Sequence, residues 1–459
     1  MKKYKLLAQG GYGNIYLDPV RMLVCKRIPK YTIKGQYILY STIVEAIVTA
    51  FVQTFPGVPF LRGIEVKDDH VAISMEHHGE TLNRWISRAK TEPGVPPGRE
   101  RRDEAYAIMR GLITTLLHFK SSNILHTDIK PCNVLISQDF PIKVTLIDFN
   151  CASVAKVEYV WGGITPRIIY SCAMSTYNFA APELVFTGRP TEQSCVWSLG
   201  LIACMIFGGG YPISSCMTHN ADRQWKNTQK EWKTIFLGLQ GESSRGSDHM
   251  IVPPYILQNM GDDFKLTSWV IRAFSWEPTA RPSLEEIATA MLGTPLPRMP
   301  LPVYEPIANP NKHPREVRGL CIERLFSVAM DTKKQSWFAT SVYILDCITT
   351  DKIEEDAAAC WVISGCLHNC YVLDDDTQVD RILHYFHVKP SLVTDRVWKL
   401  CSTEKWNLWA RPLDVVLLEE YNITFSFTEL KDIFTAMNQQ WTPSTYAAIL
   451  AIKNTSRTT

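Results

Sequence analysis

The sequence has almost no net charge and no hydrophobic run long enough to cross a membrane. Its 48 Lys and Arg residues balance 46 Asp and Glu, for a formal charge of +2. No global field would therefore draw the chain onto nucleic acid or an anionic membrane. The longest apolar run, residues 196–207, includes Ser198 and Gly200 and is much shorter than the roughly 18 residues that span a bilayer. It predicts a buried core helix.

A signal peptide and paired cysteines are also missing. The apolar stretch behind the basic first residues covers only residues 6–8, which is too short for the core of a signal peptide. The 13 cysteines include no C-x-x-C pair, and Cys366 and Cys370 have the spacing of one helix face rather than of a zinc site. We expect an intracellular protein, cytoplasmic or nuclear, with reduced and mostly buried thiols. We expect it to bind neither a membrane nor nucleic acid directly.

The pattern of apolar residues changes along the chain. Its 459 residues are enough for two or three domains at roughly 150 residues each. Alternating apolar positions up to residue 28 and at 71–75 predict an antiparallel meander, and helical spacing begins at residue 39 and dominates to about residue 292. Seven prolines between Pro295 and Pro314 predict a stiff linker. The remaining residues have the pattern of amphipathic helices.

The first 45 residues contain side chains suited to binding phosphate. Gly10, Gly11 and Gly13 lie at a strand-to-strand turn, where the absence of Cβ lets backbone N–H groups approach phosphate oxygens. Lys26 ends an apolar strand as a compact positive charge, and Glu45 in the helical segment is a candidate partner for an ion pair with it. Each feature has an ordinary alternative: a tight hairpin for the glycines, and solvated surface charges for Lys26 and Glu45.

Two motifs farther along decide between these alternatives. Residues 126–133 read His-Thr-Asp-Ile-Lys-Pro-Cys-Asn, and residues 148–150 read Asp-Phe-Asn. They resemble the H-R-D-L-K-x-x-N and D-F-G motifs of the eukaryotic protein kinase family. The resemblance implies that Asp128 orients the substrate hydroxyl and accepts its proton, and that Lys130 stabilises the transferring phosphoryl group.

The same resemblance implies ATP and Mg²⁺ as cofactors. Asn133 and Asp148 would hold the metal, because Mg²⁺ prefers hard oxygen ligands. Lys26, held by Glu45, would contact the α- and β-phosphates. The hinge is similar to that of the casein-kinase group. The resemblance places the nucleotide against the phosphate loop, the Lys26–Glu45 pair and the hinge: Leu7, Ala8, Gly10, Gly11, Gly13, Ile15, Lys26, Glu45, Met75, Glu76 and His78.

Further motifs extend the resemblance along the chain. Residues 181–183 match the family's A-P-E, and Arg281 would pair with Glu183. The implied fold is α+β and bilobal over residues 1–294. It would have a small β-rich N-lobe to about residue 78 and a large helical C-lobe from residue 79.

The expected partner is a protein substrate that carries a Ser or Thr hydroxyl. Lys130 after Asp128 is similar to the Ser/Thr branch of the family, and Thr176 matches the Thr that helps to seat a small alcohol. We therefore expect a serine/threonine-protein kinase.

Thr127 departs from the family pattern in a way that concerns regulation. It replaces the Arg that in many kinases grips a phosphorylated activation segment, so a phosphate there would lack its usual partner. We expect activity without activating phosphorylation. Alanine at Tyr170, Ser171 and Ser175 together should then leave the enzyme active.

Three other departures concern the geometry of the site. Ala8 replaces the first glycine of the phosphate loop and should stiffen it. Asn150 replaces the glycine after Asp-Phe, and its tolerance of positive φ should preserve the turn. Cys195 replaces an Asp that accepts hydrogen bonds from the catalytic-loop backbone, and because a thiol accepts poorly we expect a looser loop.

The C-terminal part resembles a cyclin box. Residues 337–346 are similar to its second helix, where an apolar face ends in Leu-Asp, and residues 404–421 are similar to the stretch that closes it. Residues 364–369 lack the Lys and acidic residues with which cyclins grip kinases, and a generic helical bundle explains the same pattern.

On this basis we expect an all-α, cyclin-like domain over residues 315–455, joined to the kinase domain by the linker 295–314. Tethering gives a local concentration on the order of millimolar, so this domain would dock on the Glu45 helix and activate the kinase in cis. The alternatives are recruitment of a partner by the C-terminal domain, and a pseudokinase scaffold in which both domains serve only as binding surfaces. The loosened motifs resemble those of kinases from large DNA viruses.

Overall fold

The computed structural model describes most of both halves of the chain. Gly11, nearly all of the Pro-rich linker and residues 404–412 lie outside the described residues. Those described are 4–10, 13–30, 40–89, 101–137, 141–159, 167–171, 175–213, 228–243, 251–293, 314–348, 352–368, 384–388, 390–403, 413–419 and 425–436.

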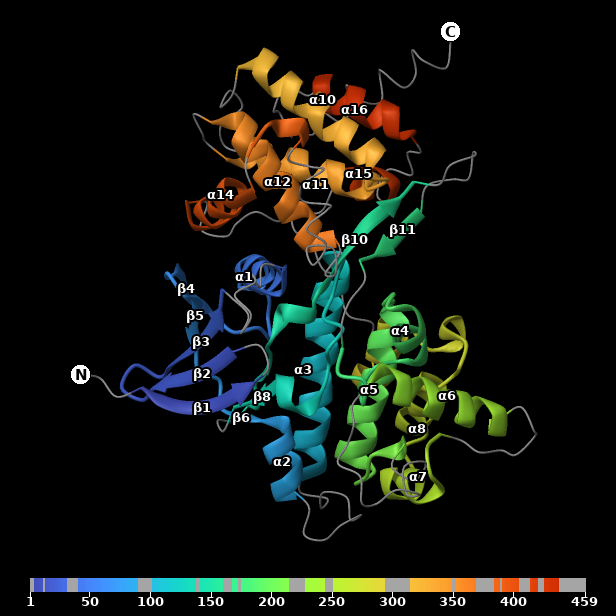
Figure 1. Ribbon diagram of the computed structural model, residues 1–459. Coiled ribbons are helices and arrows are strands. Elements are labelled where there is room, and N and C mark those ends of the chain that lie inside the picture. Colours follow the sequence, from blue (N-terminus) through green and yellow to red (C-terminus); the bar gives the residue numbers. More distant parts are fainter. Residues whose placement is uncertain are drawn as a thin grey trace.

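The first lobe is a five-stranded antiparallel sheet in the order β1-β2-β3-β5-β4, with helix α1 (Tyr40–Val52) packed beside it (Figure 1). The predicted meander is confirmed. The structure adds β4, in which only Ile64 and Val66 keep an apolar alternation and Leu61 is out of phase across an irregularity at Gly63. The strands are β1 (Lys5–Gly10), β2 (Gly13–Asp18), β3 (Leu23–Pro29), β4 (Leu61–Val66) and β5 (His70–Glu76).

Gly13 is required where the phosphate-loop turn enters β2. Its φ is +142°, and a Cβ placed there would lie 2.3 Å from the carbonyl oxygen of Arg27 on β3. Any other residue would force β2 and β3 apart, because backbone on the neighbouring strand cannot move aside cheaply. Ile15 and Lys26 are register partners across these two strands.

The second lobe is mostly helical. The predicted core helix is confirmed as α5, whose residues 194–204 are buried on every side. A capping box of Thr191 and Ser194 begins it. The helices of this lobe are α2 (Leu82–Ala89), α3 (Arg102–Ser121), α4 (Pro182–Thr187), α5 (Glu192–Phe207), α6 (Gln229–Ser243), α7 (Pro254–Met260), α8 (Phe264–Ala273) and α9 (Leu284–Leu292).

Two small sheets and two turns of 3₁₀ helix arrange the loops between the lobes. One sheet has the order β6-β8-β9 and the other the order β11-β10-β7. The segments are β6 (Glu80–Thr81), β7 (Ile124–Leu125), η2 (Pro131–Asn133), β8 (Val134–Ile136), β9 (Val144–Leu146), η3 (Phe149–Cys151), β10 (Ser153–Glu158) and β11 (Arg167–Tyr170).

The described residues beyond the linker form helices only. Two buried ion pairs join these helices: Arg318 of α10 to Asp346 of α11, at 2.7 and 2.8 Å, and Arg396 of α14 to Asp356 of α12. The helices are α10 (Arg315–Asp331), α11 (Gln335–Cys347), α12 (Ile353–His368), α14 (Pro390–Thr403), α15 (Leu413–Glu419) and α16 (Phe427–Ala436).

These C-terminal helices form a layer over the first lobe and over the β10–β11 hairpin (Figure 1). Helix α12 packs on α1, and α11, α12 and α15 pack on β10. The ammonium of Lys30 lies 5.4 Å from the ring centre of Trp398 on α14. Residues 42–50 of α1 are all buried, and one continuous hydrophobic cluster includes residues from both halves of the chain.

Among the described residues, no helix combines the length and the apolar character needed to cross a bilayer. The cysteines among these residues are free thiols. Most of them are buried, as predicted, but Cys132 is exposed.

We predict that Arg318→Ala strongly destabilises the C-terminal helices. The change removes the guanidinium that pairs with the fully buried Asp346, and breaking such a pair costs about 3–5 kcal/mol. The matched control is Glu323→Ala on the same helix, because Glu323 makes only a half-exposed pair with Lys431, worth about 1 kcal/mol or less. Urea unfolding measures both. Equal losses of stability in the two variants would contradict this account.

Candidate active site

Four side chains converge on the loop that follows β7. The carboxylate of Asp128 accepts hydrogen bonds from the backbone N–H of Thr176 at 2.8 Å, the ammonium of Lys130 at 2.7 Å and the side-chain amide of Asn133 at 3.1 Å. Lys130 also donates to the hydroxyl of Thr176 at 2.7 Å. Thr176 is 46 residues from Lys130, so the fold joins two distant segments here. The four residues that sequence reasoning singled out thus lie together.

The electrostatics of this cluster favour a charged Asp128. Burial raises the pKa of Asp128, but the charge of Lys130 and the hydrogen bonds from Lys130 and Thr176 outweigh it, so the pKa lies below 3.8. Burial lowers the pKa of Lys130, but Asp128 more than compensates and the pKa is raised. At neutral pH the site therefore holds a carboxylate and an ammonium in contact.

Lys26 lies between two carboxylates, and its predicted pairing with Glu45 is confirmed. Its ammonium is 2.6 and 2.8 Å from the two oxygens of Glu45 and 2.6 Å from Asp148. Burial lowers the pKa of Lys26, but the two carboxylates raise it above its ordinary value. Burial raises the pKa of Glu45, whose side chain is 3% exposed, while that of Asp148 is 27% exposed. Asp148 is therefore the member of this trio that is open to a ligand.

The turn at Asp148 corrects one expectation. We expected Asn150 to adopt the positive φ of the glycine it replaces, but Asn150 lies within the 3₁₀ helix η3. The positive φ, +70°, belongs to Asp148. An Asp tolerates the left-handed region better than most residues do. Asn150 lies in the helical turn that follows and does not need a positive φ.

Asn133 and Asp148, the two predicted metal ligands, lie at the same end of one hairpin. Strands β8 and β9 pair with Val134 opposite Leu146, and the N–H of Ile147 donates to the carbonyl oxygen of Asn133 at 2.9 Å. Asn133 directly precedes β8, and Asp148 follows β9 by two residues. An amide oxygen and a carboxylate are a fitting pair for a divalent metal that also takes oxygen ligands from phosphate and water.

The residues predicted to contact a nucleotide lie on the first sheet and just beyond it. Leu7, Ala8 and Gly10 are in β1, Gly13 and Ile15 in β2, and Met75 and Glu76 at the end of β5. Gly11 lies outside the described residues.

The hinge after β5 is attached to its neighbours through its backbone. The N–H groups of Glu76 and His77 donate to the carbonyl oxygens of Phe60 and Met22. The carboxylate of Glu76 pairs with Arg62. Its backbone, rather than this carboxylate, is therefore the part of Glu76 expected to contact a ligand. Burial lowers the pKa of His78, which keeps the ring neutral at physiological pH.

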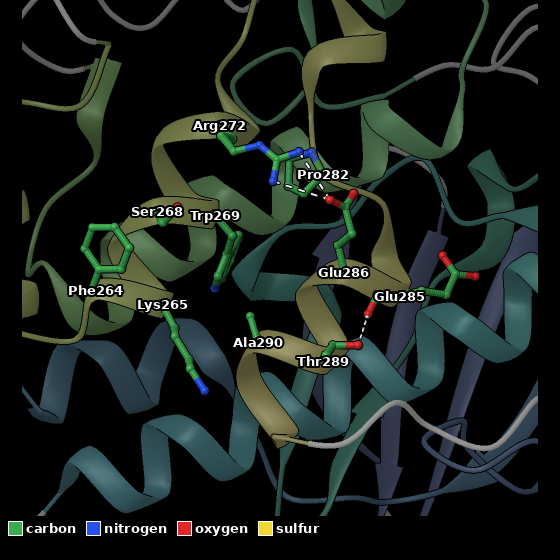
Figure 2. A pocket seen from close by; sticks show the side chains of 10 residues that line it. All are labelled: Phe264, Lys265, Ser268, Trp269, Arg272, Pro282, Glu285, Glu286, Thr289 and Ala290. Atoms are coloured by element: carbon green, nitrogen blue, oxygen red, sulfur yellow. Dashed lines mark hydrogen bonds and ion pairs between the residues drawn. The ribbon is translucent and has the colours of Figure 1, made fainter.

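A separate cavity of about 540 Å³ lies between α8 and α9 (Figure 2). Phe264 and Trp269 line one side of it, and Arg272 and Glu286 form an ion pair across it. None of its lining residues belongs to the Asp128 cluster or to the Lys26 trio. It is distinct from the candidate active site.

The family model of the protein kinase domain matches residues 1–291. The chain belongs to the protein kinase family. Protein kinases in general use ATP and a divalent metal. In agreement with membership of this family, the kinase domain combines a β-sheet N-terminal region with a helical remainder.

The relatives include kinases of several kinds. The chain is 28% identical to death-associated protein kinase dapk-1 of Caenorhabditis elegans, over 30% of this chain and 10% of that protein. It is 32% identical to serine/threonine-protein kinase PLK4 of Xenopus laevis, over 30% and 12%. It is 24% identical to serine/threonine-protein kinase BIK1 of Arabidopsis thaliana, over 51% and 55%. The matches thus span only about a tenth to about half of these relatives.

A buried ion pair anchors the end of the kinase's activation segment. Arg281 donates to both carboxylate oxygens of Glu183, at 2.8 and 2.9 Å, as predicted, and its side chain is 0% exposed. The guanidinium also lies over the ring of Trp197 and donates to the carbonyl oxygen of Ser275. This pair links the residues just after Thr176 to the helical lobe.

Thr127 and Cys195 replace charged residues of the family with neutral contacts. The hydroxyl of Thr127 donates to the carbonyl oxygen of Cys151, and Thr127 itself has a φ of +55°. Burial raises the pKa of Cys195 to about 12, and hydrogen bonds from the N–H groups of Thr127 and His126 to the sulfur act against that rise. Cys195 thus supports the loop backbone as a neutral thiol.

Sequence reasoning predicted contact between the C-terminal domain and the Glu45 helix but not the hydrogen bonds that join the kinase domain to α15. Tyr159 donates to Asp414 at 2.7 Å, and Asn123 donates to Glu419 at 2.9 Å. Tyr159 and Asn123 belong to no recognised motif, and the cyclin-like stretch 404–421 that contains Asp414 and Glu419 does not indicate what either side chain contacts. No local signal was available to find them.

We predict that Cys195→Ala destabilises the kinase more than Cys204→Ala does. Both thiols are buried on α5, but only Cys195 accepts hydrogen bonds from the catalytic loop. Leaving those N–H groups without an acceptor should cost about 1–2 kcal/mol beyond the cavity that both variants create. Chemical denaturation measures the difference. Equal effects would mean that the sulfur contributes packing alone.

Proposed function

We propose that this kinase transfers the γ-phosphoryl group of ATP, with Mg²⁺, to Ser and Thr hydroxyls of protein substrates. The observation that carries the proposal is the Asp128 cluster, in which catalytic-loop and activation-segment groups already touch. Because these groups need not be assembled at the moment of reaction, their charges can act directly on the transition state.

Asp128 would orient the substrate hydroxyl and accept its proton. Its lowered pKa keeps it unprotonated at neutral pH, as this role requires. Lys130, 2.7 Å from Asp128, would offset the negative charge on the transferring group. When bound, ATP would supply the phosphoryl group and Mg²⁺ would supply neutralisation of phosphate charge.

The remaining candidate residues would bind the nucleotide and the metal. Asn133 and Asp148 would hold Mg²⁺ through side-chain oxygens, and Lys26, held by Glu45, would contact the α- and β-phosphates. Backbone groups of Glu76 and His78 would contact adenine. The rest of the proposed cleft consists of Leu7, Ala8, Gly10, Gly11, Gly13, Ile15 and Met75.

The choice of Ser and Thr is supported by Thr176. Its backbone N–H donates to Asp128, and its hydroxyl accepts a hydrogen bond from Lys130. Thr176 thereby narrows the site beside Asp128 to a size that suits a short substrate side chain. A tyrosine hydroxyl lies about 6 Å beyond its own Cβ, roughly four side-chain bonds farther than a serine hydroxyl does.

A scaffold without catalytic activity is the alternative. It would require a site that binds partners but cannot support phosphoryl transfer. Lys26, Asp128, Asn133 and Asp148 are all present and engaged in the contacts described above, and this favours the enzyme.

For the C-terminal part we propose a cyclin-like domain over residues 315–455 that activates the kinase domain, residues 1–294, in cis. Its α12 packs on α1, the helix that carries Glu45. Asp346, at the end of the cyclin-like helix, is held by Arg318 in a buried pair. By burying α1, the domain would keep Glu45 in reach of Lys26.

We predict that Lys26→Met and Asp128→Ala each abolish phosphate transfer from γ-labelled ATP to a generic basic protein. Loss of either group removes a charge from the reaction centre, and a fall in kcat/KM of at least ~100-fold is expected. Arg27→Met on the same strand is the control and should retain activity. Hydrolysis of the labelled product should yield phosphoserine and phosphothreonine. Transfer that persists in Asp128→Ala would contradict the proposal, and phosphotyrosine alone would contradict the choice of hydroxyl.

Cis-activation predicts that residues 1–293 alone turn over more slowly than the full chain. Without α12, the apolar residues of α1 lose their cover, and the Lys26–Glu45 pair loses its support. Turnover of the two proteins is compared at equal concentrations of monomer, checked by light scattering. Equal rates would rule out activation by the C-terminal domain.

A further inference from the structure

One small sheet joins the activation segment, which follows Asp148 and includes β10 and β11, to the catalytic loop, residues 126–133, which follows β7. Strand β10 pairs on one side with β11 and on the other with β7. Ser153 and Val154 of β10 lie opposite Leu125 and Ile124, and the N–H of Ala155 donates to the carbonyl oxygen of Asn123 at 2.9 Å. The catalytic loop begins directly after β7. Any restraint on β10 is therefore passed to that loop through backbone hydrogen bonds.

Helix α15 of the C-terminal domain contacts both parts of this sheet. Near its start, Asp414 accepts a hydrogen bond from Tyr159, at the end of β10, and Glu419 at its last turn accepts one from Asn123, just before β7. Between them, Val415 packs in a small buried cluster with Ala155 and Val157. Burial raises the pKa of Asp414 to about 6, so at neutral pH it still accepts as a carboxylate.

Other C-terminal residues reinforce the same hold on β10. The ring of Tyr159 packs edge-on against Phe427 of α16, with ring centres 5.3 Å apart, and also contacts Phe425. The ammonium of Lys156 donates to the carbonyl oxygen of His368, the last residue of α12, at 3.3 Å. Helices α12, α15 and α16 therefore all contact β10 or Tyr159, the residue that follows it.

Ser171 and Thr127, two positions that would serve control by phosphorylation, make other contacts. Ser171 is 0% exposed, and its hydroxyl contacts Ser153 and the N–H of Val154. Thr127 is uncharged and therefore supplies no cation for a phosphate. Its hydroxyl donates to the carbonyl oxygen of Cys151. The β10–β11 hairpin is held by its backbone hydrogen bonds, by the ion pair of Glu158 with Arg167 and by the C-terminal domain.

We propose that α15 is a built-in positioning element, in which Asp414 and Glu419 hold the activation segment and the catalytic loop through Tyr159 and Asn123 in place of a phosphorylated residue. This inference rests on the proposed kinase function. It differs from activation through α1, because it acts on the Asp128 side of the site rather than on the Lys26–Glu45 pair.

The test uses the full chain with Glu419→Ala, Glu419→Gln and Tyr159→Phe. Each loss of a hydrogen bond in Glu419→Ala and Tyr159→Phe should lower kcat by about tenfold. The dissociation constant for ATP should not change, because Lys26 and Glu45 are untouched. Glu419→Gln keeps an oxygen that can accept from Asn123 and should restore most of kcat. Asp432→Ala on α16 and Tyr255→Phe on α7, both exposed, are the matched controls.

Two further measurements separate this inference from the proposed function. Phosphatase treatment of the wild-type protein should leave kcat unchanged, and amide hydrogen exchange in β7 and β10 should accelerate in Glu419→Ala with the thermal midpoint retained. The exchange experiment remains decisive even if the wild-type protein transfers no phosphate. Wild-type kcat in both Glu419→Ala and Tyr159→Phe, loss of activity after phosphatase treatment, or unchanged exchange would each overturn the inference.

Discussion

The structure of the candidate site depends on one buried ammonium. Lys26 is held between Glu45 and Asp148 at hydrogen-bonding distance. A charge removed from water is tolerated only with close and well-oriented partners. The three residues come from a strand, a helix and a loop, so the arrangement constrains all three elements at once. Helix α1 in particular cannot move away without separating the buried Glu45 from Lys26.

Helix α1 meets this constraint because both halves of the chain bury it. A surface helix normally keeps a polar face toward solvent, yet residues 42–50 are buried on every side. The first sheet and η3 cover part of the helix, and α12 covers another part. The C-terminal helices therefore complete the core of the first lobe, and the two halves form one hydrophobic cluster. The position of Glu45 and the packing of the C-terminal layer are energetically linked.

Where the sequence predictions differ from the structure, the reasons are local. The positive φ of the Asp-Phe-Asn turn falls at Asp148 rather than at Asn150, because the chain enters a 3₁₀ turn directly after Asp148. A motif specifies which residues are present but not which of them adopts the positive φ that the turn requires. Strand β4 went unpredicted because an irregularity at Gly63 interrupts the alternation of its apolar residues and its charged residues weaken the strand signal.

The sequence by itself predicted strands β1, β2, β3 and β5 of the first sheet and the core helix. Through its resemblance to the kinase family it also indicated the roles of Asp128, Lys130, Asn133 and Thr176 and the pairing of Lys26 with Glu45. Short-range periodicity encodes the strands and the helix locally, and compact motifs mark the site residues that the fold then brings together. Only the tertiary structure decided that Tyr159 meets Asp414, 255 residues away, and that Asn123 meets Glu419, 296 residues away. Such pairs depend on how two independently patterned halves dock. That docking is set by the whole buried surface between them, which no local pattern records.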